Sequence, residues 1–481
     1  MTTFLAILPE SILLLLAVLL LCIDPFLKKQ QSQRAFLGWY TGGGLLLAAI
    51  LTAIFARPAD PVLVFGSMLR YDWLGYIFKL VVLVAAGITA FFFMESETVQ
   101  SRGESYVLLL ASSIGMCLMV TSADLIVLYL AIETTSIPLY VLAGFLKADD
   151  RSNEAGFKYL LYGALTSAVL LYGFSLIYGF SGTTSIYQMT GFFASVNLAV
   201  LGIAFLVLAG LAFKIALFPF HFWAPDVYEG APTPVAGFLS TASKVAGFAV
   251  LLRLLTAAFP AISQDWSLIL AILATLTMTV GNLIALTQKS VKRLLAYSSI
   301  AHAGYVLIGV VAFTRLGVIS VIYYLMAYVL TNLTAFGILA IVGRVTGSDE
   351  IGAYNGLSRR NPGLALAALA AFLSLAGMPP FAGFVAKVFV FTAAIEAGWV
   401  WLAVVGVLNS IFGLYYYLNV LKAIYLYRME NQDEDQHPVP VSRPLAVLVG
   451  ILAGGMILFG VVLAPWFSMA GNAASALLTS F

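Results

Sequence analysis

Charged side chains and helix breakers interrupt an apolar stretch between residues 211 and 247. Lys214 and Lys244 each lie in a run long enough to cross a bilayer, where a charge near the centre costs on the order of 2.5 to 3.5 kcal/mol. Pro219 removes a backbone donor beside Lys214, so we expect the helix to be broken at membrane depth. Such a break requires burial against protein or a water-filled cavity. Buried lysines beside a broken helix therefore predict part of an ion path.

Two further segments repeat this combination of deep charge and apolar surroundings. Glu133 stands in LYLAIETTSIPLY, too far from either helix end for its carboxylate to reach a surface. It is either a neutral acid in a helix contact or an ionised group beside a lysine, and we favour the second. Lys387 follows Pro379 and Pro380 in AGMPPFAGFVAK, so a second helix break lies beside a lysine. We predict that both residues titrate on the same path as the first two lysines.

Other candidates have two readings from the residues alone. His302 lies mid-span in YSSIAHAGY, where a hydrogen-bonded core histidine and a proton relay fit equally well. His221 follows the first break and fits either role too. Lys158 opens a helix beside Glu154, and a solvated helix end explains it as well as a place on the path does.

The composition predicts an all-α polytopic membrane protein. The chain of 481 residues is 62% hydrophobic and 10% charged, with a mean hydropathy of +1.01. A net charge of +2 without a basic stripe argues against nucleic acid as a partner. Cys22 and Cys117 lie in apolar runs as small hydrophobic residues and form no CxxC pair, and the chain has only three histidines, so we expect no cofactor on it. The first apolar run contains Glu10 and lacks a basic start, which indicates an anchor rather than a cleaved signal peptide.

Hydropathy predicts about fourteen transmembrane helices, of which the seventh is broken at Pro219 and the twelfth at Pro379 and Pro380. The predicted spans are 4–26, 36–57, 73–94, 106–122, 124–146, 155–180, 197–228, 232–258, 266–287, 291–313, 316–344, 362–395, 399–427 and 443–466.

The loops on one side of the predicted bundle are rich in lysine and arginine, and the loops on the other side are poor in them. Sixteen lie in loops after odd-numbered helices, against three on the other side, Arg57, Arg70 and Arg315. The bias predicts that the basic loops and the acidic segment 431–437 are cytoplasmic and that both termini are extracytoplasmic. Lys79 and Arg253 lie near outer helix ends, where we expect them to snorkel to the surface.

The two breaks lie five spans apart, an odd offset that is typical of an inverted repeat of helices 4–8 and 9–13. Lys214 precedes its break whereas Lys387 follows its own, so the repeat rests on the breaks and not on the lysines. The single membrane domain, 1–481, then divides into three N-terminal helices, a first repeat, a second repeat, and a loop with the last helix: 1–105, 106–258, 259–427 and 428–481.

Three motifs carry a family resemblance. KIALFPFHFWAPDVYEGAPTPVAGFLSTASK, KRLLAYSSIAHAGY and AGMPPFAGFVAK, together with LPESILLL near the start, closely resemble the N subunits of proton-pumping NADH:quinone oxidoreductase, respiratory complex I. The related L and M subunits share FPFHxW and PTPV but usually carry IHAATMV where this chain has FLSTASK. The resemblance covers nearly the whole chain.

The resemblance implies a fold of fourteen helices with discontinuous seventh and twelfth helices, and a role in proton translocation. Quinone reduction would take place in other subunits, so this chain would hold no redox cofactor. Its partners would be protons, the lipid bilayer and the neighbouring K-type and M-type subunits, in an inner (plasma) membrane or a thylakoid. The residues that carry over as a proton path are Glu133, Lys214, Lys244, Lys387 and Lys158, with His302 as a relay between the halves.

Three other functions compete with this interpretation. A subunit of a multi-subunit cation/proton antiporter would share the fold, but sodium transport needs oxygen ligands at depth, and Glu133 is the only deep carboxylate that the sequence indicates. A related complex could be fed by ferredoxin or another donor. A purely structural subunit is disfavoured because buried lysines are costly to keep.

Overall fold

The computed structural model describes residues 2–27, 31–189, 198–259, 263–428 and 437–478. In these segments, twelve helices are long and apolar enough to cross a membrane. Two more spans are each built from two shorter helices, which gives the fourteen crossings that hydropathy predicts. The N-terminal elements are α1 (Thr2–Ala6), α2 (Leu8–Ile23), η1 (Asp24–Phe26), α3 (Gln31–Phe55), β1 (Val62–Val64), β2 (Leu69–Tyr71), α4 (Trp73–Phe93) and α5 (Glu97–Gln100).

The remaining helices follow the predicted order closely. Spans four to eight are α6 (Gly103–Thr121), α7 (Leu125–Ala143), α8 (Asp150–Ser181), α9 (Leu198–Ile215) with α10 (Trp223–Gly230), and α11 (Thr233–Ala257). Spans nine to thirteen are α12 (Ser263–Ala285), α13 (Val291–Ala312), α14 (Arg315–Thr346), α16 (Pro362–Ala376) with α17 (Ala382–Glu396), and α18 (Val400–Tyr425). Short elements η3 (Ile351–Tyr354) and α15 (Leu357–Arg360) precede α16, and α20 (Arg443–Val461) and α21 (Ala464–Leu478) close the chain.

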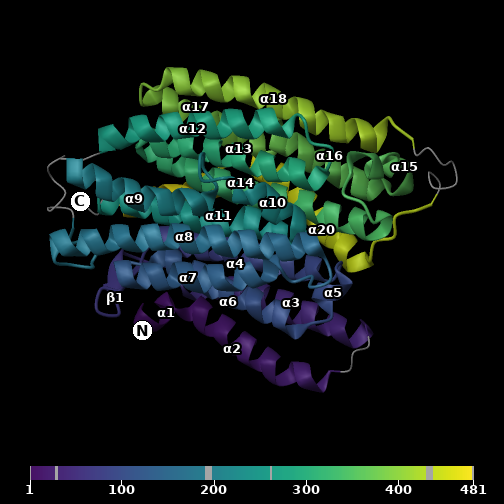
Figure 1. Ribbon diagram of the computed structural model, residues 1–481, viewed down its shortest axis with the longest axis horizontal. Coiled ribbons are helices and arrows are strands. Elements are labelled where there is room, and N and C mark those ends of the chain that lie inside the picture. The colour runs from purple at the N-terminus through teal and green to yellow at the C-terminus, as the bar shows by residue number, and fades with distance from the viewer. Residues whose placement is uncertain (1, 28–30, 190–197, 260–262, 429–436, 479–481) are drawn as a thin grey trace.

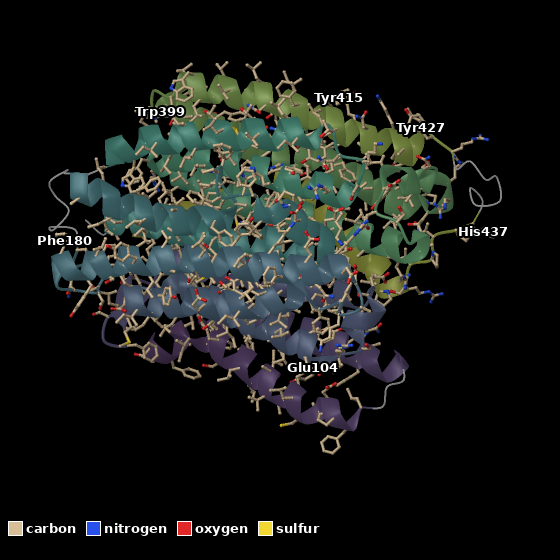
Figure 2. The ribbon with its side chains drawn as sticks, in the orientation of Figure 1. Glu104, Phe180, Trp399, Tyr415, Tyr427 and His437 are labelled. Atoms are coloured by element: carbon tan, nitrogen blue, oxygen red, sulfur yellow. The ribbon has the colours of Figure 1, made fainter. Side chains whose placement is uncertain are left out.

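The helices lie side by side in one bundle, with α2 at one edge and α18 at the other (Figure 1). Both chain ends lie at the end of the bundle that carries β1, which we call the outer end, and α15 lies at the opposite, inner end. Phe180 and Trp399 lie at the outer end, and Tyr427 and His437 at the inner end (Figure 2). The two termini thus share a side, as predicted, while the cytoplasmic identity of the inner end stays a prediction. Most of the segment 431–437 lies outside the described residues.

Three helices form the centre of the bundle. The apolar window of α11 is 100% buried and those of α13 and α14 are 94% buried, against 28% for α2 and 39% for α18. Neighbouring helices therefore separate the central three from lipid. Any ionisable group on them must be satisfied by other protein groups or by enclosed water, because lipid offers no hydrogen bonds.

Both predicted breaks are confirmed. After α9 ends at Ile215, Ala216 adopts a φ of +57°, and the chain resumes as α10 at Trp223. After α16 ends, Gly377 adopts a φ of +85°, a conformation that favours glycine, and a Cβ there would lie 2.7 Å from Cδ of Lys387. The prolines of each break supply no backbone donor, which favours the end of a helix there.

The order of helix lengths is consistent with the predicted inverted repeat. The first set runs 19, 19 and 32 residues, a broken span, then 25. The second set runs 23, 22 and 32 residues, a broken span, then 26. The boundaries of the repeats stay a prediction.

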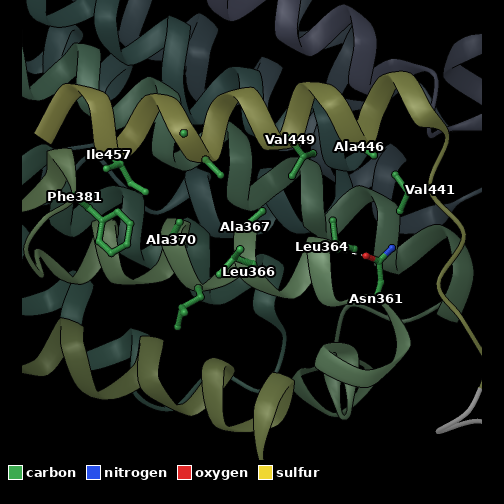
Figure 3. Close-up of a pocket in the computed structure, with 15 residues that line it drawn as sticks. Asn361, Leu364, Leu366, Ala367, Ala370, Phe381, Val441, Ala446, Val449 and Ile457 are labelled. Carbon is green, nitrogen blue, oxygen red and sulfur yellow. Dashed lines mark hydrogen bonds between the residues drawn. The ribbon is translucent and has the colours of Figure 1, made fainter. Parts of the chain in front are cut away.

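The C-terminus differs from the predicted span 443–466. Helix α20 ends at Val461, and a separate helix, α21, packs against α14 and α4. Its fully buried alanines, Ala470, Ala473 and Ala474, let it lie close to these neighbours. Beside α20, an apolar groove of about 450 Å³ runs along α16, lined by residues such as Ala367, Val449 and Ile457 (Figure 3). Its lining contains no charged side chain, so we do not assign it to the ion path.

The topology can be tested with two cysteine substitutions at exposed positions, Asp60→Cys in the loop before β1 and Glu350→Cys before η3. In right-side-out membranes, we expect a membrane-impermeant maleimide to label position 60 and not position 350, because the basic loops lie at the inner end. Inside-out vesicles should give the reverse. Labelling of position 350 from the outside would invert the assignment.

Candidate functional site

Lys214 lies in the last turn of α9, where the helix breaks. Its side chain is buried, and Nζ donates a hydrogen bond to Oγ of Ser136 on α7. Unpaired carbonyls and the negative end of the dipole lie at a helix C-terminus, so this position favours a cation. The break therefore provides part of the environment that lets an ammonium group stay inside the bundle.

Glu133 lies one helical turn before Ser136 on α7 and is half-buried. Its Oε1 accepts a hydrogen bond from Ser167 on α8. Glu133 and Lys214 are not among the ion pairs found in the described residues, so the two charges do not contact each other directly. Ser136 lies between them along α7, and it holds the lysine.

Lys244 is at the centre of the bundle on α11 and is 2% exposed. Its Nζ donates to the carbonyl oxygen of Ser299 at 2.6 Å and lies 2.9 Å from the Ser299 hydroxyl, on α13. Both partners are neutral. This ammonium group is held by hydrogen bonds and not by a counter-ion.

The α13 segment YSSIAHAGY places one row of polar side chains toward its neighbours, because residues three and four apart share a helix face. His302 Nδ1 lies 2.7 Å from the Tyr324 hydroxyl of α14, and Nε2 lies 3.2 Å from the Tyr417 hydroxyl of α18. Tyr417 also hydrogen-bonds Ser298, the neighbour of the serine that holds Lys244. His302 is thus connected to the surroundings of the central lysine.

Lys387 lies in the first half of α17, beyond the second break. Its Nζ donates to the carbonyl oxygen of Ala376, the last residue of α16, at 2.9 Å. It also lies 4.9 Å from the centre of the Tyr305 ring, which in turn packs against His302 with ring centres 5.7 Å apart. The lysine therefore reaches back to a helix C-terminus and joins the row on α13 at its outer side.

Lys158 belongs to a different environment. Its Nζ lies 2.6 Å from Glu154, four residues earlier on α8, and 2.6 Å from Asp226 on α10. Arg293 of α13 contacts the same aspartate at 3.2 Å and also pairs with Glu229. About a third of the Lys158 side chain is exposed, so this ion network lies at the surface of the inner half, apart from the row formed by the other lysines and His302.

Two basic residues that the sequence suggested would snorkel are instead buried in ion pairs, so that prediction was wrong. Arg253 of α11 binds Asp72, the N-cap of α4, through two hydrogen bonds of 2.9 and 3.0 Å. Lys79 of α4 lies 2.6 Å from Glu10 of α2. Each basic side chain ends at a buried carboxylate and does not extend to the surface.

Asp72 and Glu10 are two further buried carboxylates, and each lies near the outer end of its helix and not at the middle as Glu133 does. Asp72 is 1% exposed and Glu10 is 7% exposed. The signal for Glu10 was a charge in the first apolar run. The sequence provided little indication that Asp72 is buried, because an aspartate directly after a short hairpin is usually an exposed turn residue.

Metal ligands do not gather in the part of the chain that the structure describes. No three histidine, cysteine, aspartate or glutamate side chains lie close enough together there to hold an ion. The absence of a cofactor stays a prediction.

Comparison with known sequences gives a consistent set of relatives. The family described as NADH:quinone oxidoreductase/Mrp antiporter, transmembrane, matches residues 122–413. NADH-quinone oxidoreductase subunit N of Trichlorobacter lovleyi is 42% identical and covers 95% of this chain and 94% of its own length. NAD(P)H-quinone oxidoreductase subunit 2 of a Nostoc species is 38% identical and covers 97% of this chain and 92% of its own length.

Solved structures agree. A chain of respiratory complex I from Thermus thermophilus, with bound aureothin, is 34% identical, with a TM-score of 0.80 over 97% of this chain and 99% of that one. A chain of the Mrp complex from a Dietzia species has a TM-score of 0.86 over 99% of this chain and 97% of that one. At 23% identity, the second likeness concerns the fold alone.

The Arg253–Asp72 pair yields a stability prediction. Asp72 contacts two buried arginines, Arg253 and Arg70, so Asp72→Asn leaves both without their carboxylate. Such a loss costs about 3–5 kcal/mol, so we expect much less folded protein in the membrane. Asp72→Asn combined with Arg253→Met and Arg70→Met should recover most of the loss, because no charge of the cluster is then left unpaired. Arg315→Met, at an exposed site of the same end, is the matched control and should have no effect. Detergent-resistant protein measured by fluorescence-detected chromatography would check this, and equal losses in the single and triple variants would contradict it.

Proposed function

This chain belongs to the NADH-quinone oxidoreductase subunit N family, and on that premise we propose that it moves protons across the membrane as a subunit of a quinone-reducing complex. Quinone reduction takes place in other subunits, and this chain carries no redox cofactor. Its neighbours in the complex are K-type and M-type membrane subunits. Its basic inner end faces the cytoplasm, with both termini on the other side of a bacterial plasma membrane.

The observation that carries the proposal is the site of Lys244. A lysine at the centre of a fully enclosed helix is held by the carbonyl and hydroxyl of Ser299 alone among the described groups. A hydrogen-bonded lysine without a fixed negative partner can give up its proton without leaving an unpaired carboxylate behind, so both protonation states are accessible.

The remaining groups extend this site across the bundle. Lys214 and Glu133 lie toward α7, whereas His302 and Lys387 lie toward α17. Glu133, Lys244 and His302 lie near the middle of their helices, and Lys214 and Lys387 lie beside the two helix breaks. The row therefore runs across the helices and not along them. We propose that protons pass along this row by short transfers through hydroxyls and enclosed water, and that each lysine binds a proton when its neighbour's proton moves away. Lys158 stays a proposed member of the path, although its ion network with Glu154 and Asp226 lies apart from the row.

The second candidate function is that of a cation/proton antiporter component, because a chain of the Mrp complex has the same fold. Two observations weigh against sodium transport. The buried carboxylates Asp72 and Glu10 are each held by a basic residue, so neither offers a free oxygen to a cation. Glu133 accepts a hydrogen bond from Ser167, and the other deep titratable groups of the row are lysines and a histidine.

The first test is Lys244→Met in the assembled complex. Methionine keeps the approximate volume and removes the titrating amine, so we expect assembly to persist and proton pumping to fall at least roughly a hundredfold, as when a positioned proton-transfer group is lost. Lys422→Met, which alters an exposed lysine at the inner end, should pump normally. Pumping can be followed with a pH-sensitive dye in proteoliposomes. Full pumping by the assembled Lys244→Met complex would remove Lys244 from the path.

A second test concerns Glu133 and Lys214. Glu133→Gln and Lys214→Met should each lower pumping. Because Ser136 and not Glu133 holds the lysine, we expect the two assembly defects to be coupled only weakly, by less than about 1 kcal/mol. The double variant should still not pump, because both titrating groups are gone. Pumping at the normal rate in the double variant would show that neither residue conducts, and strong coupling would show a direct pair.

A further inference from the structure

The aromatic ring of Tyr305, on α13, lies against the ammonium group of Lys387 at the second helix break. Nζ of Lys387 lies 4.9 Å from the ring centre, inside the distance of about 6 Å at which a ring face attracts a cation. Both side chains are buried, with 2% of Tyr305 and 5% of Lys387 exposed. None of the ion pairs of the described residues involves Lys387. The ring is therefore the negative surface that this ammonium group contacts.

The helix break forms the other sides of the place that the ammonium group occupies. Nζ donates to the carbonyl oxygen of Ala376 at 2.9 Å, which is its only hydrogen bond to a described residue. A Cβ at Gly377 would lie 2.7 Å from Cδ of Lys387 and 3.2 Å from Nζ, so the absence of a side chain there leaves room for the lysine. An ammonium group has three donors. The backbone of the break thus satisfies Lys387 only in part.

The hydroxyl end of the Tyr305 ring is held by Asn282 of α12. Nδ2 of Asn282 donates to the Tyr305 hydroxyl oxygen at 3.0 Å and to Oδ1 of Asn409, on α18, at 3.3 Å. Oδ1 of Asn282 accepts a hydrogen bond from the Tyr416 hydroxyl at 3.0 Å. Asn282 is completely buried, and its amide nitrogen and oxygen are both used. A satisfied buried network of this kind favours one arrangement of its members, so α12 and α18 fix the orientation of the ring.

The same ring also contacts His302, one turn earlier on α13. The two ring centres are 5.7 Å apart, with the ring planes at 72°. Phe391, one turn after Lys387 on α17, packs against Tyr305 with ring centres 6.3 Å apart. Neighbours on α13 and α17 therefore confine the ring between the lysine of the break and the histidine of the row.

A looser form of this arrangement occurs at the first break. Nζ of Lys214 lies 6.0 Å from the centre of the Tyr140 ring, on α7. Helices α7 and α13 are the second helices of the two predicted repeats, so the two rings have corresponding places. Lys214 also donates to the hydroxyl of Ser136, whereas Lys387 has no hydroxyl partner among the described residues. The contact with a ring is thus closer where the lysine has fewer other partners.

We propose that Tyr305 is a positioning residue for Lys387, because its ring holds the charged side chain at the end of α16 and beside His302. This role rests on the proposed proton-moving function. A ring face attracts an ammonium group and not a neutral amine. The contact therefore forms when Lys387 binds a proton and weakens when the proton leaves, so the ring holds the lysine only while there is a proton to pass on.

The experiment changes the electron density of the ring and keeps its size. Tyr305→Phe is compared, in the full complex, with the same variant carrying a trifluorinated phenylalanine, whose fluorines withdraw electron density from the ring face. Both lack the bond to Asn282, so they differ only in attraction for a cation. We expect pumping per assembled complex to be about tenfold slower with the fluorinated ring, within the range that a cation–π contact contributes. A pH-sensitive dye in proteoliposomes gives the rates.

Tyr323 of α14 provides the matched control. It is completely buried, its hydroxyl donates to the carbonyl oxygen of Phe459 at 2.7 Å, and its ring packs against Phe467 with centres 5.0 Å apart. No basic side chain of the described residues lies over this ring. Tyr323→Phe and its trifluorinated counterpart should therefore pump at equal rates.

A second pair of proteins serves if Tyr305→Phe does not assemble. A difluorinated tyrosine at position 305 keeps the hydroxyl that Asn282 binds, and it is compared with the unchanged complex by the same measurement. The fluorinated protein should again be the slower one.

The outcomes distinguish the positioning role from the proposed function. Equal rates for the fluorinated and unfluorinated rings at position 305, in a complex that Lys387→Met impairs, overturn the positioning role and leave the function standing. An equal loss from fluorination at position 323 shows a packing effect and overturns the role too. Normal pumping by assembled Lys387→Met removes the group that Tyr305 would position, and normal pumping by Lys244→Met as well overturns the function itself.

Discussion

Keeping ammonium groups inside a lipid-embedded bundle is the constraint on which the rest of this structure depends. Lipid offers neither hydrogen bonds nor counter-ions, so each buried charge must be satisfied by protein. The structure does this in two distinct ways. Arg253 and Lys79 are neutralised by carboxylates on other helices. Lys214, Lys244 and Lys387 instead donate hydrogen bonds to hydroxyl groups and backbone carbonyls.

On the proposed function, the difference between these two solutions separates charges that hold helices together from charges that take up and release protons. A buried ion pair resists any change of charge, because losing one partner leaves the other uncompensated. The Arg253–Asp72 pair joins the N-terminal part to the rest of the bundle, and the Lys79–Glu10 pair joins two helices within the N-terminal part. A lysine held by neutral acceptors has no such restriction. Beside the serine that holds Lys244, Ser298 and His302 of α13 both hydrogen-bond Tyr417 of α18.

The two helix breaks serve the same purpose in both halves of the bundle. Lys214 lies in the last turn of α9, and Lys387 donates to the last carbonyl of α16, so both ammonium groups are at the C-terminal end of a first half-helix. In sequence order, one lysine precedes its break and the other follows it, yet both ammonium groups lie at the C-terminal end of a half-helix. The dipole and the free carbonyls of that end therefore act on both charges.

The helical membrane fold, both breaks and the depth of the lysines could be predicted from the sequence, because these depend on the length of apolar runs and on proline chemistry within a few residues. The row YSSIAHAGY could be predicted as well, since helical spacing puts those side chains on one face. The partners of the charged groups could not be predicted and follow from the packing of the helices. That Arg253 meets Asp72, that Ser136 and not Glu133 holds Lys214, and that Lys158 belongs to a surface network with Asp226 all depend on which distant helices pack together. Hydropathy carries no information about which helices pack together, because every membrane-spanning helix is similarly apolar.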